Sequence, residues 1–273
     1  MRKNIQEKLS LYKVNIMNGN DSSVMSGIMV KNSARWLPAF FKQVENMTYP
    51  DNKLRLVFSY GNSNDKTLDL IKEYKEKSKY KVEVFAEPQD RFLKMGGAQC
   101  AAAIYKDFQQ LLDEDYFLLL DSDLTKIPPN LIQELMRVQA DIVAPYTWSE
   151  NKRHFYDNFI FRIQNLRFSP QDPPGNKLTY PIRVGSCGCC FLADGKVWKE
   201  TEIANPYPNL TFCYNAARAG ALVAAVPYLE CEHVDLEKYG INHMPLHQKY
   251  GGWPSAEAFL TSDYIVEPVP LRD

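Results

Sequence analysis

Short apolar segments alternate with amphipathic ones through the first half of the chain. The apolar segments are bounded by turn-forming and polar residues, as buried strands are. The predicted strands cover residues 24–30, 54–60, 81–85, 116–120 and 142–145, and the predicted helices cover 35–47, 66–77 and 128–139. A further Ala-rich helix follows Gly96 and Gly97 and ends near Leu112. Strands that alternate with helices predict a mainly parallel, doubly wound α/β sheet.

The second half of the chain has a less regular pattern. A strand is predicted over residues 183–192, a helix over 210–220 that closes on Gly220, and a strand over 221–226. The chain has 273 residues, 45% of them hydrophobic, and no Gly/Ser-rich or Pro-rich linker divides it. We therefore expect a single domain over residues 1–273, with halves at about 20–125 and 126–273.

Composition and charge exclude several classes of protein. The formal net charge is −1 and no basic stripe is evident, so no extended nucleic-acid surface is expected. No segment is long and apolar enough for a membrane span, and the N-terminus lacks an apolar signal-peptide core, which predicts a soluble, cytoplasmic protein. The six cysteines favour no disulfide framework. The segment Cys187–Cys190 is interpreted as buried small side chains rather than as a zinc site.

Polar residues follow three of the predicted strands, at positions 31–32, 61–65 and 121–123. In doubly wound sheets, sites lie beyond the carboxyl ends of the strands. Asp121 and Asp123 flank Ser122 directly after the most hydrophobic strand, where two carboxylates can converge on Mg²⁺ or Mn²⁺. An Asp-x-Asp sequence alone is a weak signal and could be a solvated loop or a helix cap. Its position after a buried strand favours a metal and diphosphate site.

His233 is the candidate for a third metal ligand, through a neutral imidazole nitrogen. It follows a predicted strand and has Glu232 and Asp235 beside it. The alternative is an ordinary hydrogen-bonded histidine. His154 and the two histidines of the C-terminal tail have no comparable context.

Several segments, in order, resemble GT-A glycosyltransferases over roughly residues 24–235. Residues 59–67 (SYGNSNDKT) look like the nucleoside-binding loop of family-2-type enzymes, and 117–123 (FLLLDSD) like their metal-binding strand end. Residues 140–148 (ADIVAPYTW), 155–158 (FYDN) and 184–192 (VGSCGCCFL) resemble the fungal Golgi mannan-synthesising α-mannosyltransferases, and 216–220 (AARAG) is typical of GT-A enzymes. The resemblance implies a GT-A (Rossmann-like), doubly wound mixed sheet with helices on both faces.

The resemblance also implies roles for individual residues. Asn32 and Asp65 would contact the nucleoside, Asp121 the ribose or metal-bound water, and Asp123 the metal and diphosphate, which makes these two the first catalytic candidates. Trp148, Gly185 and Ser186 would line the sugar and acceptor side, and Asp157 would orient substrate as a further catalytic candidate. The structural alternatives are turn or capping chemistry for Asn32 and Asp65, core packing for Trp148, and a surface carboxylate for Asp157.

The implied activity is transfer of a sugar from a GDP- or UDP-sugar to an acceptor hydroxyl on a glycan or glycoconjugate, with Mn²⁺ or Mg²⁺ as cofactor. The mannosyltransferase resemblance slightly favours GDP-mannose. Many inverting GT-A enzymes carry an acid just before the late helix, but the matching residues 209–212 (NLTF) contain none, and Asp194, Glu200 and Glu202 are displaced. This absence favours a retaining mechanism, and the alternative is an inverting one whose base comes from Asp157 or elsewhere.

Two other functions stay open at this point. A sugar-nucleotide nucleotidyltransferase has a similar layout, although its triphosphate loop is usually Gly-rich, unlike residues 31–35 (KNSAR). A non-catalytic carbohydrate- or nucleotide-binding protein on a GT-A fold is the other alternative.

Overall fold

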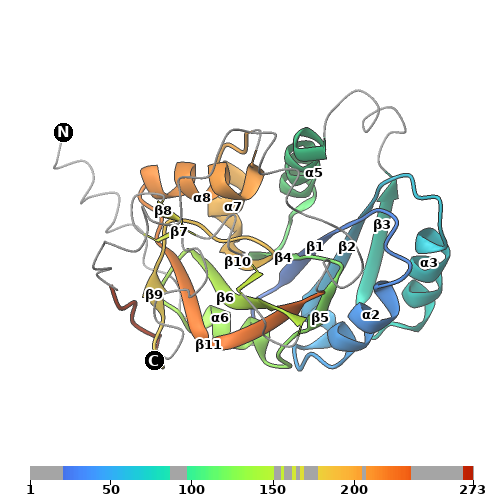
Figure 1. Ribbon diagram of the computed structural model, residues 1–273, viewed down its shortest axis with the longest axis horizontal. Coiled ribbons are helices and arrows are strands. Elements are labelled where there is room, and N and C mark those ends of the chain that lie inside the picture. The colour runs from blue at the N-terminus through green and yellow to red at the C-terminus, as the bar shows by residue number, and fades with distance from the viewer. Residues whose placement is uncertain are drawn as a thin grey trace.

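The structure is a computed structural model that describes residues 21–86, 97–150, 155–156, 162–163, 167–168, 178–204, 207–234 and 267–272. One nine-stranded mixed sheet runs through both halves of the described chain, with strand order β3-β2-β1-β4-β10-β6-β11-β5 and β9 paired to β11 (Figure 1). No helix in these residues is long and apolar enough to cross a bilayer. A cytoplasmic location and a single-domain organisation of the whole chain stay predictions.

The first half forms the parallel part of the sheet. Its strands are β1 (Val24–Val30), β2 (Leu54–Tyr60), β3 (Lys81–Ala86) and β4 (Tyr116–Leu120), connected through α2 (Leu37–Glu45), the short 3₁₀ helix η1 (Asp51–Lys53), α3 (Thr67–Lys77) and α5 (Gly97–Leu111). All of the pairings among these strands are parallel. The predicted strands and helices of this half are confirmed. They could be predicted because each buried strand ends at polar residues that begin the next turn.

The second half adds antiparallel strands, so the sheet is mixed. Its elements are β5 (Leu124–Lys126), α6 (Leu131–Met136), β6 (Ile142–Ser149), β9 (Ile182–Arg183), β10 (Cys190–Asp194), α7 (Gly195–Glu200), α8 (Pro208–Arg218) and β11 (Val223–His233). A separate pair is formed by β7 (Arg162–Ile163) and β8 (Arg167–Phe168). Strand β10 lies antiparallel between β4 and β6, whereas β11 runs parallel to β6.

Several boundaries in this half differ from the sequence predictions. Strand β6 continues four residues beyond the predicted end at Pro145, and α6 is shorter than the predicted helix over 128–139. The predicted strand over 183–192 is two short strands, because β9 pairs with β11 while β10 pairs with β4 and β6. The chain changes partners between them through Cys189, which has a φ of 54°. Strand β11 extends seven residues beyond the predicted end at Val226, with a register shift between Val226 and Glu230. The shift lets the strand pass Pro227, whose nitrogen cannot donate a hydrogen bond.

Helices cover both faces of the sheet (Figure 1). One core lies between the sheet and α2, α3 and α6, and the other lies between the sheet and α5, α7 and α8. Strand β4 faces both, because Leu118 and Leu120 lie in the first core while Phe117 and Leu119 lie in the second. A strand buried on both faces needs a continuous apolar sequence, which explains why β4 is predicted so clearly.

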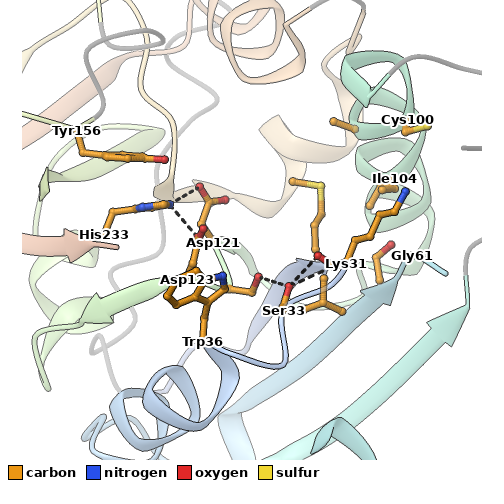
Figure 2. Close-up of a pocket in the computed structure, with 15 residues that line it drawn as sticks. Lys31, Ser33, Trp36, Gly61, Cys100, Ile104, Asp121, Asp123, Tyr156 and His233 are labelled. Carbon is orange, nitrogen blue, oxygen red and sulfur yellow. Dashed lines mark hydrogen bonds and ion pairs between the residues drawn. The ribbon is translucent and has the colours of Figure 1, made fainter. Parts of the chain in front are cut away.

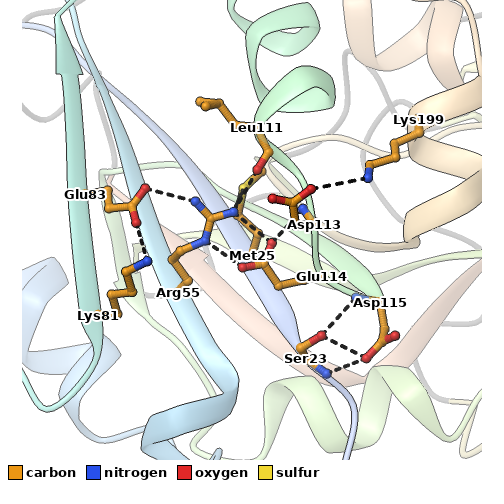
Figure 3. A network of polar contacts seen from close by, with 10 residues as sticks. All are labelled: Ser23, Met25, Arg55, Lys81, Glu83, Leu111, Asp113, Glu114, Asp115 and Lys199. Carbon is orange, nitrogen blue, oxygen red and sulfur yellow. Dashed lines mark hydrogen bonds and ion pairs between the residues drawn. The ribbon is translucent and has the colours of Figure 1, made fainter.

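Charged residues gather at the amino ends of the parallel strands, opposite the polar loops (Figure 3). The Arg55 guanidinium donates from Nε to Glu114 at 2.6 Å and from Nη1 to Glu83 at 2.9 Å. The carboxylate of Asp115 accepts from both the backbone nitrogen and the hydroxyl of Ser23, each at 2.8 Å. These bonds tie β1, β2 and β3 to the turn before β4. The acids at this end are therefore engaged in structural contacts.

Candidate active site at the carboxyl ends of the strands

An open pocket of about 370 Å³ lies where the loops after β1, β2 and β4 meet (Figure 2). The end of β11, one side of α5 and Tyr156 complete its walls. Its lining residues are Met29, Val30, Lys31, Ser33, Trp36, Ser59, Gly61, Cys100, Ala101, Ile104, Asp121, Ser122, Asp123, Tyr156 and His233. The pocket therefore occupies the position expected for a ligand site in a doubly wound sheet.

Backbone hydrogen bonds on both sides fix the Asp121–Asp123 turn. The nitrogen of Asp121 donates to the Cys189 carbonyl at 3.0 Å, and the nitrogen of Val234 donates to the Asp123 carbonyl at 3.0 Å. Between the two acids, Ser122 is buried, and its hydroxyl oxygen lies 3.5 Å from that of Ser33. Because the main chain is held in this way, both carboxylates project into the pocket (Figure 2).

His233, the last residue of β11, brings a nitrogen to the two carboxylates. Its Nε2 lies 2.8 Å from an Asp123 oxygen and 4.0 Å from an Asp121 oxygen. Its Nδ1 lies 3.0 Å from the Val234 carbonyl oxygen. A carbonyl can only accept, so Nδ1 carries the hydrogen and Nε2 is the atom that faces the carboxylates.

The three side chains fit a divalent metal ion. One ligand atom from each of Asp121, Asp123 and His233 lies within 4.8 Å of the others. Two carboxylate oxygens and an imidazole nitrogen form a donor set that suits Mn²⁺, and the open pocket leaves room for further oxygen ligands. The arrangement of the three side chains supports their prediction as metal ligands. That a metal ion occupies the site stays a proposal.

The electrostatics of the cluster also favour a metal site. Burial, and then the neighbouring charge of Asp123, raise the pKa of Asp121 to about 7. Burial by itself would lower the pKa of His233, but the carboxylates of Asp123 and Asp121 outweigh that effect and raise it. Two carboxylates beside one imidazole are an excess of acidic groups, and bound protons or a divalent metal ion would offset their negative charge.

The two predicted nucleoside residues brace the loops beside the pocket. Asn32, with a φ of 50°, accepts the backbone N–H of Asn64 at 2.9 Å. Asp65 accepts the backbone N–H groups of Ala34 at 3.1 Å and Thr67 at 3.0 Å, which holds the start of α3 against the loop after β1. These are the turn and capping contacts of the structural alternative. Neither residue lines the pocket, and a nucleoside contact by either stays a prediction.

The predicted sugar-side residues lie apart from the pocket lining. Trp148 in β6 packs edge to face on Phe155, with ring centroids 5.6 Å apart. Gly185 and the buried Ser186 lie on the segment that connects β9 to β10. Asp157 lies outside the described residues. The roles proposed for these four residues stay predictions.

Other pocket residues were missed by sequence reasoning. Tyr156 stacks on His233, and Trp36 and Lys31 come from the loop after β1. Lys31 belongs to the polar positions 31–32 and Trp36 follows them closely, which was a usable signal, but the sequence did not indicate the direction of either side chain. Among the described residues, Asp121 and Asp123 are the carboxylates that line the pocket. Asp194 instead caps α7 by accepting from the backbone nitrogens of Lys196 and Val197.

Residues 21–173, more than half of the chain, match the glycosyltransferase family 25, N-terminal domain. This chain belongs to glycosyltransferase family 25. A glycosyltransferase 25 family member of Aedes aegypti is 27% identical over 146 residues, which are 48% of this chain and 24% of that protein. Procollagen galactosyltransferase 1 of Danio rerio is 23% identical over 269 residues, or 89% of this chain and 43% of that protein. The chain thus spans less than half the length of these family 25 relatives.

Solved structures confirm the GT-A fold of this family 25 member. S. aureus TarS (residues 1–349) in complex with UDP-GlcNAc superposes with a TM-score of 0.58 at 13% identity, over 87% of this chain and 63% of that chain. The mannosyltransferase PcManGT of Pyrobaculum calidifontis, in complex with GDP-Man and Mn²⁺, gives 0.57 at 13% identity, over 93% and 72%. At this identity the likeness shows the fold alone. The specific resemblance to fungal mannan-synthesising enzymes is not confirmed.

Proposed function

We propose that this chain is a metal-dependent glycosyltransferase that moves a sugar from a nucleotide diphosphate sugar to an acceptor hydroxyl. The observation that carries the proposal is the Asp121–Asp123–His233 cluster in an open pocket at the carboxyl ends of the strands. Membership of family 25 supports glycosyl transfer over the nucleotidyltransferase alternative.

The pocket has two chemically different ends. Asp121, Asp123 and His233 form the acidic end, where they would hold Mn²⁺ or Mg²⁺. When bound, the ion would offset the charge of the departing nucleotide diphosphate. The other end carries Lys31 and the apolar Ile104 beside Gly61 (Figure 2). We assign the nucleoside to this second end, so that the diphosphate bridges the pocket and the sugar lies near His233.

Positioning is the main contribution that the protein makes in this proposal. A fixed turn at Asp121 and Asp123 holds the carboxylates before any ligand arrives, which lowers the entropic cost of the reactive arrangement. No third carboxylate lines the described part of the pocket to act as a base on the acceptor. This supports the proposal that the anomeric configuration is retained, with Asp157 as the remaining candidate for orienting substrate.

For the donor we propose a UDP-hexose first and GDP-mannose second. A relative over 89% of this chain is named a procollagen galactosyltransferase, which favours a UDP-hexose such as UDP-galactose. Structural neighbours were solved with UDP-GlcNAc and with GDP-Man, so both nucleotides belong in the test. The acceptor is proposed to be a hydroxyl of a glycan or glycoconjugate.

A panel of nucleotide sugars tests the proposal directly. Each donor is incubated with the purified chain in Mn²⁺ or in EDTA, and release of the nucleoside diphosphate is measured. We expect release from one donor class with Mn²⁺ and none with EDTA. Thermal stabilisation by a nucleoside diphosphate without turnover of any donor would instead support the non-catalytic binding protein. Release of pyrophosphate from a nucleoside triphosphate and a sugar phosphate would support a nucleotidyltransferase.

A further inference from the structure

Tyr156 covers one face of the His233 imidazole. The two ring centroids are 3.7 Å apart and the ring planes differ by 12°, which is a parallel stack (Figure 2). Tyr156 is half-buried and lines the pocket, whereas His233 is buried. The tyrosine ring therefore covers one face of the imidazole at the edge of the open pocket.

The residue before Tyr156 anchors it in this position. Phe155 is buried and packs on Tyr146, with centroids 5.3 Å apart, and on Trp148 at 5.6 Å. The backbone of Phe155 also forms an antiparallel bridge to Trp148. In the β6–β11 pairing, Trp148 lies opposite Glu232, the neighbour of His233. The anchored Phe155 thus delivers the next side chain over the end of β11.

Two contacts restrain the imidazole in different directions. The hydrogen bond from Nδ1 to the Val234 carbonyl directs the ring within its own plane. The Tyr156 stack opposes tilting of that plane. Together they keep Nε2 directed at Asp123 and Asp121, where a metal ligand must point. Residues that orient a ligating histidine in this way commonly change metal affinity 10–100-fold when they are replaced.

We propose that Tyr156 is a positioning residue whose ring holds the His233 imidazole in the orientation that binds the metal ion. This inference rests on the metal site of the proposed function. The flat ring supplies the restraint, and the phenol hydroxyl is not required for it. Phenylalanine at this position therefore preserves the restraint, and an aliphatic or amide side chain removes it.

The experiment measures Mn²⁺ binding in the absence of any donor or acceptor. Calorimetry gives the Kd, and pulsed electron paramagnetic resonance detects the ¹⁴N coupling of a coordinated imidazole. The variants are Tyr156→Phe, Tyr156→Leu and Tyr156→Gln, with His233→Ala as the reference for loss of the nitrogen ligand. Tyr228→Leu is the matched control, because Tyr228 is 38% exposed on the same strand as His233. Two ringless variants are used so that one misfolded protein does not decide the result.

We expect Tyr156→Phe and Tyr228→Leu to bind Mn²⁺ like the wild type, with the ¹⁴N coupling intact. Tyr156→Leu and Tyr156→Gln should raise the Kd about tenfold and weaken the coupling. Wild-type affinity and coupling in both ringless variants, with loss in His233→Ala, would overturn the positioning role and leave the metal site standing. Loss in Tyr156→Phe equal to that in the ringless variants would also overturn it, since the hydroxyl would then be the group that acts. A wild type that binds no Mn²⁺ would overturn the metal site itself and this inference with it.

Discussion

The two halves of the sheet are built by different rules. Strands β1 to β4 pair in parallel with uninterrupted register, and a helix lies between each strand and the next in sequence. The strands beyond β4 pair in both directions, and β11 shifts register between Val226 and Glu230. Local βα units thus form the first half, whereas long-range pairing decides the second.

The candidate site takes different parts from these two halves. Asp121 and Asp123 come from the end of β4, where the main chain is fixed by hydrogen bonds on both sides. The second half supplies His233, which lies beyond the register shift in β11, and Tyr156, which covers it. We infer that the first half supplies the two carboxylates that are essential to the reaction. The second half adjusts the metal site through His233 and Tyr156.

The largest effect is expected for Asp123→Asn. Loss of a carboxylate from the metal end should lower donor turnover about 10²–10³-fold, because stabilisation of several kcal/mol by the ion is lost. The fold should survive, since the backbone carbonyl of Asp123, not its side chain, accepts from Val234. The measurement is Mn²⁺-dependent release of nucleoside diphosphate, with the melting temperature recorded in parallel.

Asp113→Asn is the matched control for that variant. The Asp113 side chain is 94% exposed and has a 3.9 Å contact with Lys199 at the other end of the strands. Its turnover should stay within about twofold of wild type, as exposed ion pairs contribute little. Full metal-dependent turnover in Asp123→Asn would remove the carboxylate turn from the reaction.

A smaller effect is expected for His233→Ala, which removes the proposed ligand that the second half supplies. Loss of a ligand should raise the Kd for Mn²⁺ at least about tenfold, and turnover should partly recover at saturating Mn²⁺. Glu232→Gln is the control, because Glu232 pairs with Lys126 at 3.2 Å. An unchanged Mn²⁺ affinity in His233→Ala would show that the second half does not contribute to the metal site.

The same division explains how much of the fold could be predicted from the sequence. The bounds of β1, β2 and β4 agree with the prediction to the residue, because strands buried on both faces are apolar throughout and end at polar turns. Strand β5 has only three residues and depends on its pairing with β11, so no local pattern indicates it. The extension of β11 was missed because Pro227 resembles the end of a strand.

Prediction of the candidate site from the sequence has a similar limit. Asp121, Asp123 and His233 could be predicted, because each follows a strand and offers metal-binding chemistry. Asn32 and Asp65 have the same kind of position, yet their side chains bond to neighbouring backbone instead of lining the pocket. The sequence places a residue at the edge of a sheet, but competing local hydrogen bonds decide where its side chain points.

Tight packing of the first half is tested at Gly27 in β1. A Cβ there would lie 2.7 Å from the Phe117 ring and 2.9 Å from that of Phe108. Gly27→Ala should therefore lower the free energy of unfolding by about 1–3 kcal/mol, as overpacking does. Ser26→Ala on the same strand is the control: its buried hydroxyl has no hydrogen-bond partner among the described residues, so removing it should be neutral or stabilising. Denaturant titration measures both, and an undiminished stability of Gly27→Ala would contradict tight packing.

The smallest effect concerns the titration of Asp121 and His233, which lie in different halves of the sheet. Without metal, the folded state raises the pKa of Asp121 from 3.8 to about 7, so it binds a proton that the unfolded chain releases. Stability of the metal-free protein should therefore fall as pH rises through that window. The raised pKa of His233 acts in the same direction, because stability gained from its protonated form is also lost as pH rises.

Mn²⁺ bound at the proposed site would compete with these protons, so its stabilising effect should increase with pH. We expect the difference in melting temperature between Mn²⁺ and EDTA to be a few degrees larger at about pH 7.5 than at about pH 5.5. Asp121→Asn removes the titrating carboxylate and should flatten this dependence, and differential scanning calorimetry measures it. An equal increment at both pH values would mean that Mn²⁺ does not displace protons from Asp121 and His233.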